Sequence, residues 1–206
     1  MIGPKLSHSL TEIAGVPAAL LEDAIRIYRA HYAATGIAQS RLYPGIRGLL
    51  EDFVAAGRPI AVATQKPEGL ARTVLAHHGI AGLFHSIRGS AADEAAGGTG
   101  TDPSGSVPEG KAGIVAAALS DLAAASPASA GLAVMVGDRA QDVAGAAANG
   151  LDCIGVGWGF APDGELHAAG AVEIVHTTTA LHATITRLSA RPGTTALNEV
   201  HTDGNV

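Results

Sequence analysis

This 206-residue sequence is poor in several residue types, and each shortage excludes a class of protein. Aromatic residues make up only 3% of the chain, which argues against a broad stacking surface for bases or sugars. Lysine and arginine never form a run and the formal net charge is −6, so the electrostatic footprint of a nucleic-acid-binding protein is missing. No apolar stretch approaches the roughly 20 residues that a membrane-spanning helix needs.

Cysteine occurs once, at Cys153, so the chain cannot form a disulfide framework of its own. Cys153 lies in the apolar run of residues 151–156, which predicts a buried and unreactive thiol. The first residues do not have the basic-then-apolar pattern of a secretory signal peptide. We therefore expect a soluble, cytoplasmic protein with neither nucleic acid nor a membrane as a partner.

The chain does contain short apolar runs that alternate with helical patterns. Buried strands are predicted at residues 59–63, 132–136 and 151–156, and weaker strands at 85–88 and 173–175. Strands that alternate with helices indicate βαβ units, and fully apolar strands are typical of a parallel sheet covered on both faces. The sequence thus predicts an α/β fold with a doubly wound, mostly parallel sheet and helices on both faces.

The predicted elements divide the chain into three regions. Residues 6–34 read as two helices with no strand between them, which indicates a helical cap over residues 1–42. The α/β core is expected over 43–190 and a disordered tail over 191–206. Within the core, the low-complexity residues 91–109 predict a long mobile loop.

The most informative stretch of the sequence is the pair of carboxylates that follows the apolar run 132–136. A buried strand that ends in Gly137-Asp138 places the acid at the carboxyl edge of a sheet, where open α/β folds bind ligands. If a helix begins near Arg139, Asp138 and Asp142 lie on one side of its first turn. Two oxygen ligands without a neighbouring His or Cys suit Mg²⁺. The alternative is that the two acids only cap the helix and pair with its dipole.

Two further polar residues occur where a strand ends or a helix begins. Thr64 follows the strand 59–63, where its hydroxyl can hold a phosphate oxygen or simply cap the helix expected from Pro67. Lys111 opens a helix and so opposes the helix dipole, which a nearby anion would offset; the alternative is a solvated surface lysine. Because the carboxyl ends of neighbouring strands face one crevice, these groups together predict the equipment of phosphoryl transfer.

The order of these segments resembles the haloacid dehalogenase (HAD) superfamily of phosphatases, most closely the branch that includes phosphoglycolate phosphatases and 5′-nucleotidase-like proteins. The similarity extends from Ile2 to about residue 188 and is carried by residues 2–6 (IGPKL), 43–46 (YPGI), 61–67 (AVATQKP), Lys111, 136–142 (VGDRAQD), 154–159 (IGVGWG) and 165–171 (ELHAAGA).

The resemblance implies a role for each matching residue. Thr64 would bind the phosphate, and Lys111 would steady both the phosphate and the nucleophile. Asp138 and Asp142 would hold Mg²⁺. Gln65 and Lys66, which follow the threonine, and Lys5, on the cap segment, would contact the substrate.

One departure from the family is serious. Its first motif, DxDGT, carries the nucleophilic aspartate and the general acid and base, yet no Asp-x-Asp occurs in this sequence. The family places that motif on a first strand, a few tens of residues before the segment that matches residues 2–6. Two explanations are open. In the first, the start codon is misassigned or the protein is cut, and the full-length product is an active phosphatase. In the second, the short chain is real and cannot perform the family's covalent chemistry.

We favour the first explanation, because clustering Lys111 with two acids is costly without a phosphate and a metal. Loss of a central strand would also expose edges on both of its neighbours. The leading hypothesis is a Mg²⁺-dependent phosphomonoester hydrolase of the HAD type. It would act on a small metabolite phosphate, such as phosphoglycolate or a nucleoside monophosphate, and be inactive as the 206-residue chain.

Two alternatives come from other functional classes. The first is a non-catalytic relative that binds phosphate or metal in a regulatory capacity. The second is a phosphoacceptor domain resembling bacterial response regulators, which is disfavoured because the acid cluster falls toward the C-terminal end of the chain.

Overall fold

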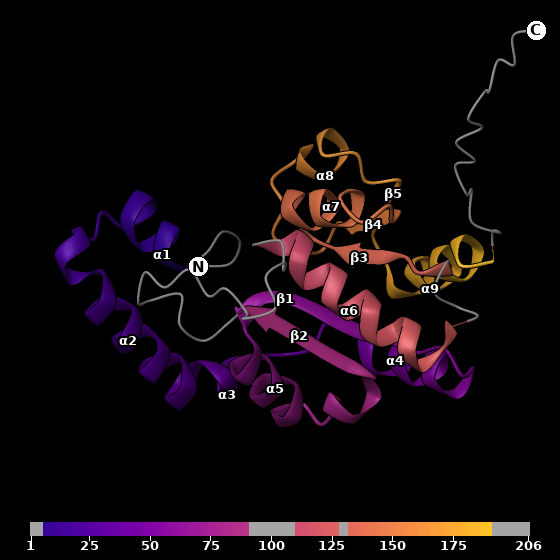
Figure 1. Cartoon of the computed structure of the whole chain (residues 1–206), viewed down its shortest axis with the longest axis horizontal. Coiled ribbons are helices and arrows are strands. Elements are labelled where there is room, and N and C mark those ends of the chain that lie inside the picture. The colour runs from indigo at the N-terminus through magenta and orange to yellow at the C-terminus, as the bar shows by residue number, and fades with distance from the viewer. Residues whose placement is uncertain (1–5, 91–109, 128–131, 191–206) are drawn as a thin grey trace, which may run out of the picture.

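The computed structural model describes residues 6–90, 110–127 and 132–190. Its strands form two separate parallel sheets (Figure 1). In the first sheet, β1 (Ala61–Pro67) pairs with β2 (Ser86–Ser90). The second sheet has the order β3 (Met135–Gly137), β4 (Cys153–Val156) and β5 (Glu173–Val175). The predicted α/β fold with parallel strands is confirmed, and the new finding is that its sheet is divided.

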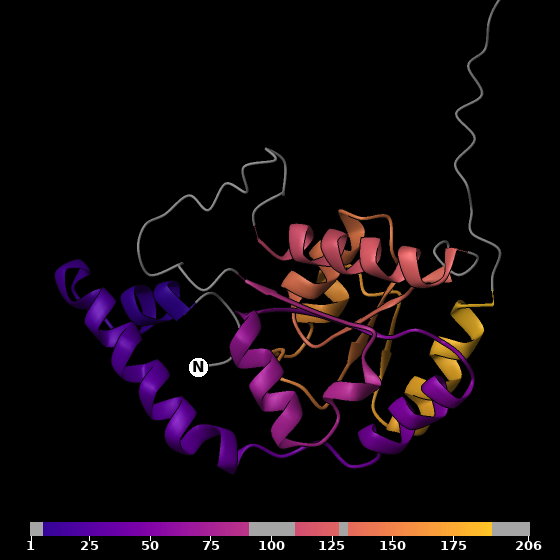
Figure 2. The same ribbon diagram turned by 60° about the horizontal axis from the view of Figure 1, so that its bottom comes forward.

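Helices cover both faces of the strands, as predicted. The helices of this region are α4 (Ile46–Ala55), α5 (Glu68–His77), α6 (Lys111–Ala125), α7 (Ala140–Ala147), α8 (Glu165–Ala168) and α9 (Thr178–Leu188). Figure 2 shows α6 on one face and α4, α5 and α9 on the other. None of the helices in the described residues is long and apolar enough to cross a membrane.

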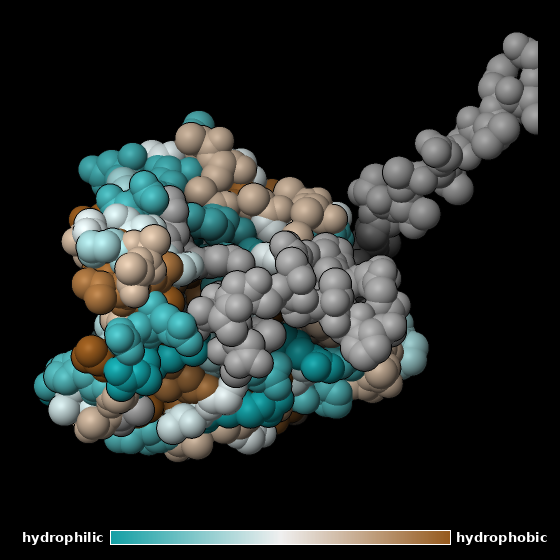
Figure 3. Space-filling model, turned by 60° about the vertical axis from the view of Figure 1, so that its left-hand side comes forward, coloured by the Kyte–Doolittle hydropathy of each residue, from teal (hydrophilic) through white to brown (hydrophobic). Residues whose placement is uncertain are grey.

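The N-terminal helices form an arm at one end of the molecule (Figures 1 and 2). They comprise α1 (Leu6–His8), α2 (Leu21–His31) and α3 (Ile37–Gln39), linked by short π-helical and 3-10 turns. Large apolar side chains on this arm remain exposed, among them Ile13 and Ile27, and Figure 3 shows hydrophobic patches on this side of the molecule. The division of the chain at residue 42 stays a prediction.

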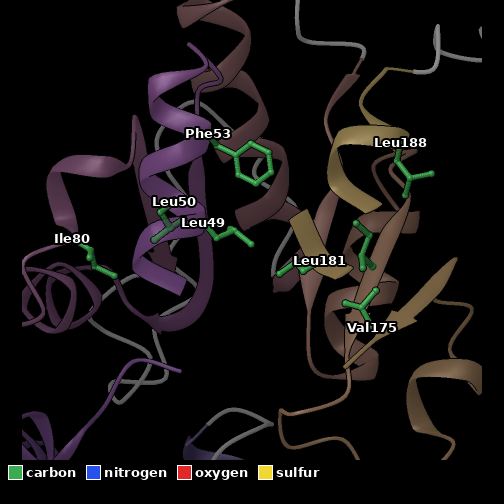
Figure 4. Packing of buried hydrophobic residues seen from close by; sticks show 8 residues of the cluster. Leu49, Leu50, Phe53, Ile80, Val175, Leu181 and Leu188 are labelled. Carbon is green, nitrogen blue, oxygen red and sulfur yellow. The ribbon is translucent and has the colours of Figure 1, made fainter. Parts of the chain in front are cut away.

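Two apolar clusters hold the strands and helices together. The larger one packs α4 and α9 against β4 and β5, and its buried members are Leu49, Leu50, Phe53, Ile80, Ile154, Val175, Leu181 and Leu188 (Figure 4). The smaller one packs α7 and α8 against β4 and contains Cys153. Burial raises the pKa of the Cys153 thiol to about 12, which agrees with the predicted buried and unreactive cysteine.

Two strand boundaries differ from the predictions, the end of β1 and the start of β3. β1 continues to Pro67, well beyond the predicted end at residue 63, although its pairing with β2 loses its regular register after Ala63. β3 is short and starts only at Met135, where the backbone first pairs with the β4 segment. The predicted loop at 91–109 and tail at 191–206 lie outside the described residues.

Candidate active site

Lys111 lies at the centre of the predicted site, as the first residue of α6. Its Nζ lies 2.7 Å from Asp142 Oδ1 and donates a hydrogen bond of 2.6 Å to the carbonyl oxygen of Ala63. Only 12% of the lysine side chain is exposed, so the alternative of a solvated surface lysine is wrong. A lysine at the start of a helix predicted a nearby anion, and that anion is Asp142. One ammonium group therefore connects β1 of the first sheet with α7 beside the second sheet.

Asp142 turns back toward the loop that precedes its helix. Its Oδ2 accepts hydrogen bonds from the backbone N–H groups of Asp138 (3.0 Å) and Arg139 (3.1 Å). A Cβ on Gly137 would lie only 2.2 Å from the Asp142 Cβ, so this close approach requires glycine. Both carboxylate oxygens of Asp142 thus have protein partners, and the side chain fixes the loop while it neutralises Lys111.

Asp138 lies in the loop between β3 and α7, at the carboxyl end of the strand. Its Oδ2 accepts a hydrogen bond of 2.9 Å from the backbone N–H of Phe160. Gly159 permits this contact, because a Cβ there would lie 2.2 Å from the Asp138 Cβ. No hydrogen bond from the described residues reaches Oδ1, which leaves that oxygen for a ligand.

Glu165 is a supporting residue whose function the sequence analysis missed. Its Oε1 accepts hydrogen bonds of 2.8 Å from both Arg139 Nε and the backbone N–H of Ala140. These bonds, the one from Arg139 first, hold the pKa of Glu165 below its ordinary value. Glu165 thereby anchors the start of α7 and the Asp138 loop from a distant helix. The only sequence signal was an acid in the first turn of a predicted helix, which has many uses.

Thr64 occupies the point where regular pairing of β1 with β2 ends. Its Oγ1 accepts a hydrogen bond of 3.2 Å from the backbone N–H of Lys66. The helix α5 begins at Glu68 with Pro67 as its N-cap, so the reading of Thr64 as a plain helix cap is wrong. Thr64 directly follows Ala63, whose carbonyl binds Lys111, and therefore lies at the same sheet edge as the lysine.

Gln65 and Lys66 both contact residues of neighbouring elements, and their predicted contact with the substrate stays a prediction. The carbonyl oxygen of Gln65 accepts a hydrogen bond of 3.0 Å from Ser90 Oγ. The Lys66 ammonium lies 4.5 Å from the centre of the Tyr32 ring, a cation–π contact with the N-terminal arm. Burial lowers the pKa of Lys66. Lys5, the third predicted substrate-binding residue, lies outside the described residues.

The donor set fits Mg²⁺ in part. No group of three or more His, Cys, Asp or Glu side chains that could hold a metal occurs among the described residues. Mg²⁺, however, commonly uses one or two carboxylates and completes its shell with phosphate and water oxygens. Asp138 can offer Oδ1 in this way, whereas both oxygens of Asp142 are already hydrogen-bonded. The assignment of Mg²⁺ to these two acids stays a prediction.

Several known proteins resemble this chain in sequence and in fold. The sequence profile of the haloacid dehalogenase-like hydrolases matches residues 5–150. Tyrosine-protein kinase PtkA of Mycobacterium tuberculosis is 40% identical over 160 residues, which cover 78% of this chain and 49% of that protein. A 5′-nucleotidase of Pseudomonas aeruginosa is 35% identical over 171 residues, or 81% of this chain and 68% of the relative.

A solved structure shares the fold as well. The crystal structure of a predicted phosphatase from Clostridium acetobutylicum matches with a TM-score of 0.74 and 32% identity, covering 90% of this chain and 78% of that one. The chain spans about half the length of PtkA, the kinase that it matches. The family profile, the relatives and the shared fold together show that this chain belongs to the haloacid dehalogenase-like hydrolases.

Proposed function

We propose that this chain provides the phosphate-binding core of a Mg²⁺-dependent phosphomonoester hydrolase that acts on a small phosphorylated metabolite. The observation that supports the proposal is Lys111, which is held between the carbonyl of Ala63, the residue before Thr64, and Asp142, whose carboxylate also fixes the Asp138 loop. Positioning and charge stabilisation account for most catalysis of phosphoryl transfer, and this arrangement offers both.

Two side chains would bind the phosphate directly. The Thr64 hydroxyl can donate to one phosphate oxygen while it accepts the N–H of Lys66. Lys111 would supply positive charge, and its contacts with Asp142 and Ala63 fix the ammonium in place before a ligand arrives. A preformed clamp of this kind avoids ordering a flexible lysine when the phosphate binds.

The acids would serve different purposes. Asp138 would hold Mg²⁺ through Oδ1, while Asp142 would orient the Asp138 loop through its backbone contacts. When bound, Mg²⁺ would neutralise charge on the phosphoryl oxygens. Glu165 would keep the loop aligned through Arg139 and Ala140.

Hydrolysis by this family's chemistry also needs a carboxylate nucleophile beside the phosphorus. The sequence contains no Asp-x-Asp, and both oxygens of Asp142 are occupied. We therefore expect the 206-residue chain to bind phosphate without turning it over. Turnover would require an aspartate delivered between Thr64 and Asp138.

Calorimetry with inorganic phosphate in the presence of Mg²⁺ tests the clamp. We expect saturable binding that Lys111→Met and Thr64→Val each weaken about tenfold, as loss of one charged or polar contact would. Asp138→Asn should remove the dependence on Mg²⁺. Thr73→Val and Asp163→Asn, which change exposed residues, are matched controls that should bind as the parent chain does. A flat titration of the parent chain would contradict the proposal.

The 40% identity to a protein named tyrosine-protein kinase favours a second candidate, phosphoryl transfer onto a tyrosine. The same clamp could hold the terminal phosphate of a nucleotide. Incubation with terminally labelled ATP and a tyrosine-containing peptide separates the two functions. Label in the peptide would support the kinase, whereas label that stays on the nucleotide agrees with a chain that binds phosphate without turning it over.

A further inference from the structure

Exposed aromatic side chains lie close together in a protein that has few aromatic residues. The chain contains three Phe, three Tyr and one Trp. Only Tyr43 and Phe160 are exposed, at 42% and 51%, whereas the other aromatic residues are buried or partly buried. Tyr43 contacts the Trp158 ring, and Phe160 follows Trp158 by two residues. Core packing does not explain two exposed rings beside one tryptophan, and exposed apolar groups that gather in this way mark binding surfaces.

The loop after β4 carries two of these rings and is tied at both ends. Its first residue, Gly157, donates its backbone N–H to the carbonyl oxygen of Val175 in β5 at 2.9 Å. At the other end, the backbone N–H of Phe160 donates to Asp138 Oδ2 at 2.9 Å. The backbone that carries Trp158 and Phe160 is therefore held in place before any ligand binds.

Tyr43 reaches the same place from the turn that precedes α4. Gly45 in this turn packs against Thr178, the first residue of α9, and a Cβ on Gly45 would lie 2.5 Å from Thr178 Oγ1. Because α9 begins shortly after β5, the turn lies at the carboxyl end of the second sheet. The rings of Tyr43 and Trp158 meet there edge to face, with centroids 6.5 Å apart and planes at 60°. Tyr43, Trp158 and Phe160 form an aromatic cluster at this end of the sheet.

Hydrogen bonds connect the aromatic cluster with the proposed phosphate site. Asp138 accepts the Phe160 N–H through its side chain and donates its own backbone N–H to Asp142. Asp142 in turn pairs with Lys111. Two carboxylates thus separate Phe160 from the ammonium group that would hold the phosphate. A phosphate bound at Lys111 would have the Asp138 loop, and next to it Phe160, on the side of the second sheet.

We propose that the aromatic cluster recognises the organic part of the substrate, and that this part carries a flat, unsaturated ring. The inference rests on the proposed function, since the bound phosphate would hold the ring beside Phe160. Flat rings gain stacking and edge-to-face contacts with aromatic side chains beyond the apolar area that they bury, and saturated groups do not. Three side chains suffice for one ring but not for a run of stacked bases, which agrees with the low aromatic content.

A flat ring distinguishes between the substrates that the family resemblance implies. A nucleoside monophosphate carries such a ring, whereas phosphoglycolate carries a second anionic group, which calls for a cation. Lys111 and Arg139 already pair with Asp142 and Glu165. An aryl phosphate is a further source of the same chemistry, with the ring bonded directly to the ester oxygen. The distance between ring and phosphorus separates these two sources.

Calorimetry with two matched pairs of phosphate esters tests the need for a ring. Phenyl phosphate and cyclohexyl phosphate are similar in size, but only the first has a flat ring. AMP and ribose 5-phosphate differ by the base. Inorganic phosphate measures the phosphate site alone. We expect the ligand with the flat ring to bind about tenfold more tightly than its partner in at least one pair. A preference in the phenyl pair alone indicates an aryl phosphate, and one in the AMP pair alone indicates a nucleotide.

The fluorescence of Trp158 provides a second readout, because this residue is the only tryptophan of the chain. Excitation is set beyond the absorbance of the ligands. A ring bound at the aromatic cluster should change the emission of Trp158 with the same affinity that calorimetry gives. Cyclohexyl phosphate or ribose 5-phosphate should change the emission less at equal saturation. A purely structural role of the cluster predicts no difference within a pair.

Substitutions assign the preference to particular rings. Phe160→Leu keeps an apolar side chain and the backbone N–H that binds Asp138, and Tyr43→Leu likewise keeps apolar bulk. Each should reduce the preference for the flat ring at least about threefold, whereas Tyr43→Phe keeps the ring and should keep the preference. Val54→Ala is the control, because it removes exposed apolar surface near the other end of α4 and should leave the preference unchanged.

Two results would overturn the proposal while the phosphate site stands. The first is binding of inorganic phosphate with equal affinities within both pairs of esters. The second is a preference for the flat ring that both leucine variants retain. If neither inorganic phosphate nor any ester binds the parent chain, the proposed function fails and the inference fails with it.

Discussion

Strands of similar apolar composition are buried to different extents in the two sheets of this protein. β4 has a strand on each side, and its Ile154 has no exposed surface. β1 begins with an equally apolar Ala-Val-Ala, yet none of its residues is fully buried. The difference follows from the number of neighbouring strands. The apolar composition of a strand sets how much surface it can bury, and the number of neighbouring strands sets how much of that surface is buried.

The largest expected effect of this difference is on stability. Ile154→Ala would leave a cavity in the main cluster and lower the free energy of unfolding by about 3 kcal/mol. Val136→Ala removes methyl groups from a partly exposed residue and should cost roughly 0.5–1 kcal/mol. Urea unfolding of both variants measures the comparison. Equal costs would show that β3 is as well covered as β4.

Much of the fold could be predicted because it depends on local patterns. The predicted strands at 151–156 and 173–175 agree with β4 and β5 to within two residues at each end. Each lies beside a strand that its own apolar run already indicated. The extension of β1 to Pro67 was missed because it depends on contacts such as Ser90 with the Gln65 carbonyl. Such contacts have no signature in the sequence near β1.

The site shows the same limit. Residue types alone indicated Lys111, Asp138 and Asp142, and a lysine at a helix start predicted a nearby anion. That this anion is Asp142, and that Glu165 braces the loop, required the folded arrangement of α6, α7 and α8. Within the described residues, β1 pairs only with β2 and β3 only with β4, an arrangement that the separate strand signals could not predict.

The next effect concerns the lysine that connects the two sheets. Lys111→Met should lower the free energy of unfolding by about 1–2 kcal/mol, because it leaves Asp142 and the Ala63 carbonyl without a charged partner in a partly buried site. A double-mutant cycle with Asp142→Asn, followed by urea unfolding, isolates the ion pair. Additive effects of the two substitutions would show that the pair does not couple the sheets.

Low pH should destabilise the protein at the contact between Asp121 and the first sheet. Hydrogen bonds from Arg88 and Ser86 lower the pKa of Asp121 from 3.8 to about 2. A carboxylate with a lowered pKa stabilises the fold fully above pH 3.8, and this contribution is lost as the pH falls toward 2. After allowance for solvent screening we expect a loss of about 1 kcal/mol. Chemical unfolding at pH 5 and pH 2.5 measures it, and Asp121→Asn should remove this part of the pH dependence.

The smallest expected effect concerns the contact between the N-terminal arm and the first sheet, which the second sheet does not share. Lys66, at the end of β1, places its ammonium over the Tyr32 ring, and burial lowers the pKa of Lys66. Tyr32→Leu should therefore cost about 0.5–1 kcal/mol and speed hydrogen exchange in α2, whereas Tyr32→Phe keeps the ring and should change neither. Exchange in β4 should be the same in both variants, because β4 lies in the other sheet. If Tyr32→Phe has the full effect, the hydroxyl and not the ring holds the arm against β1.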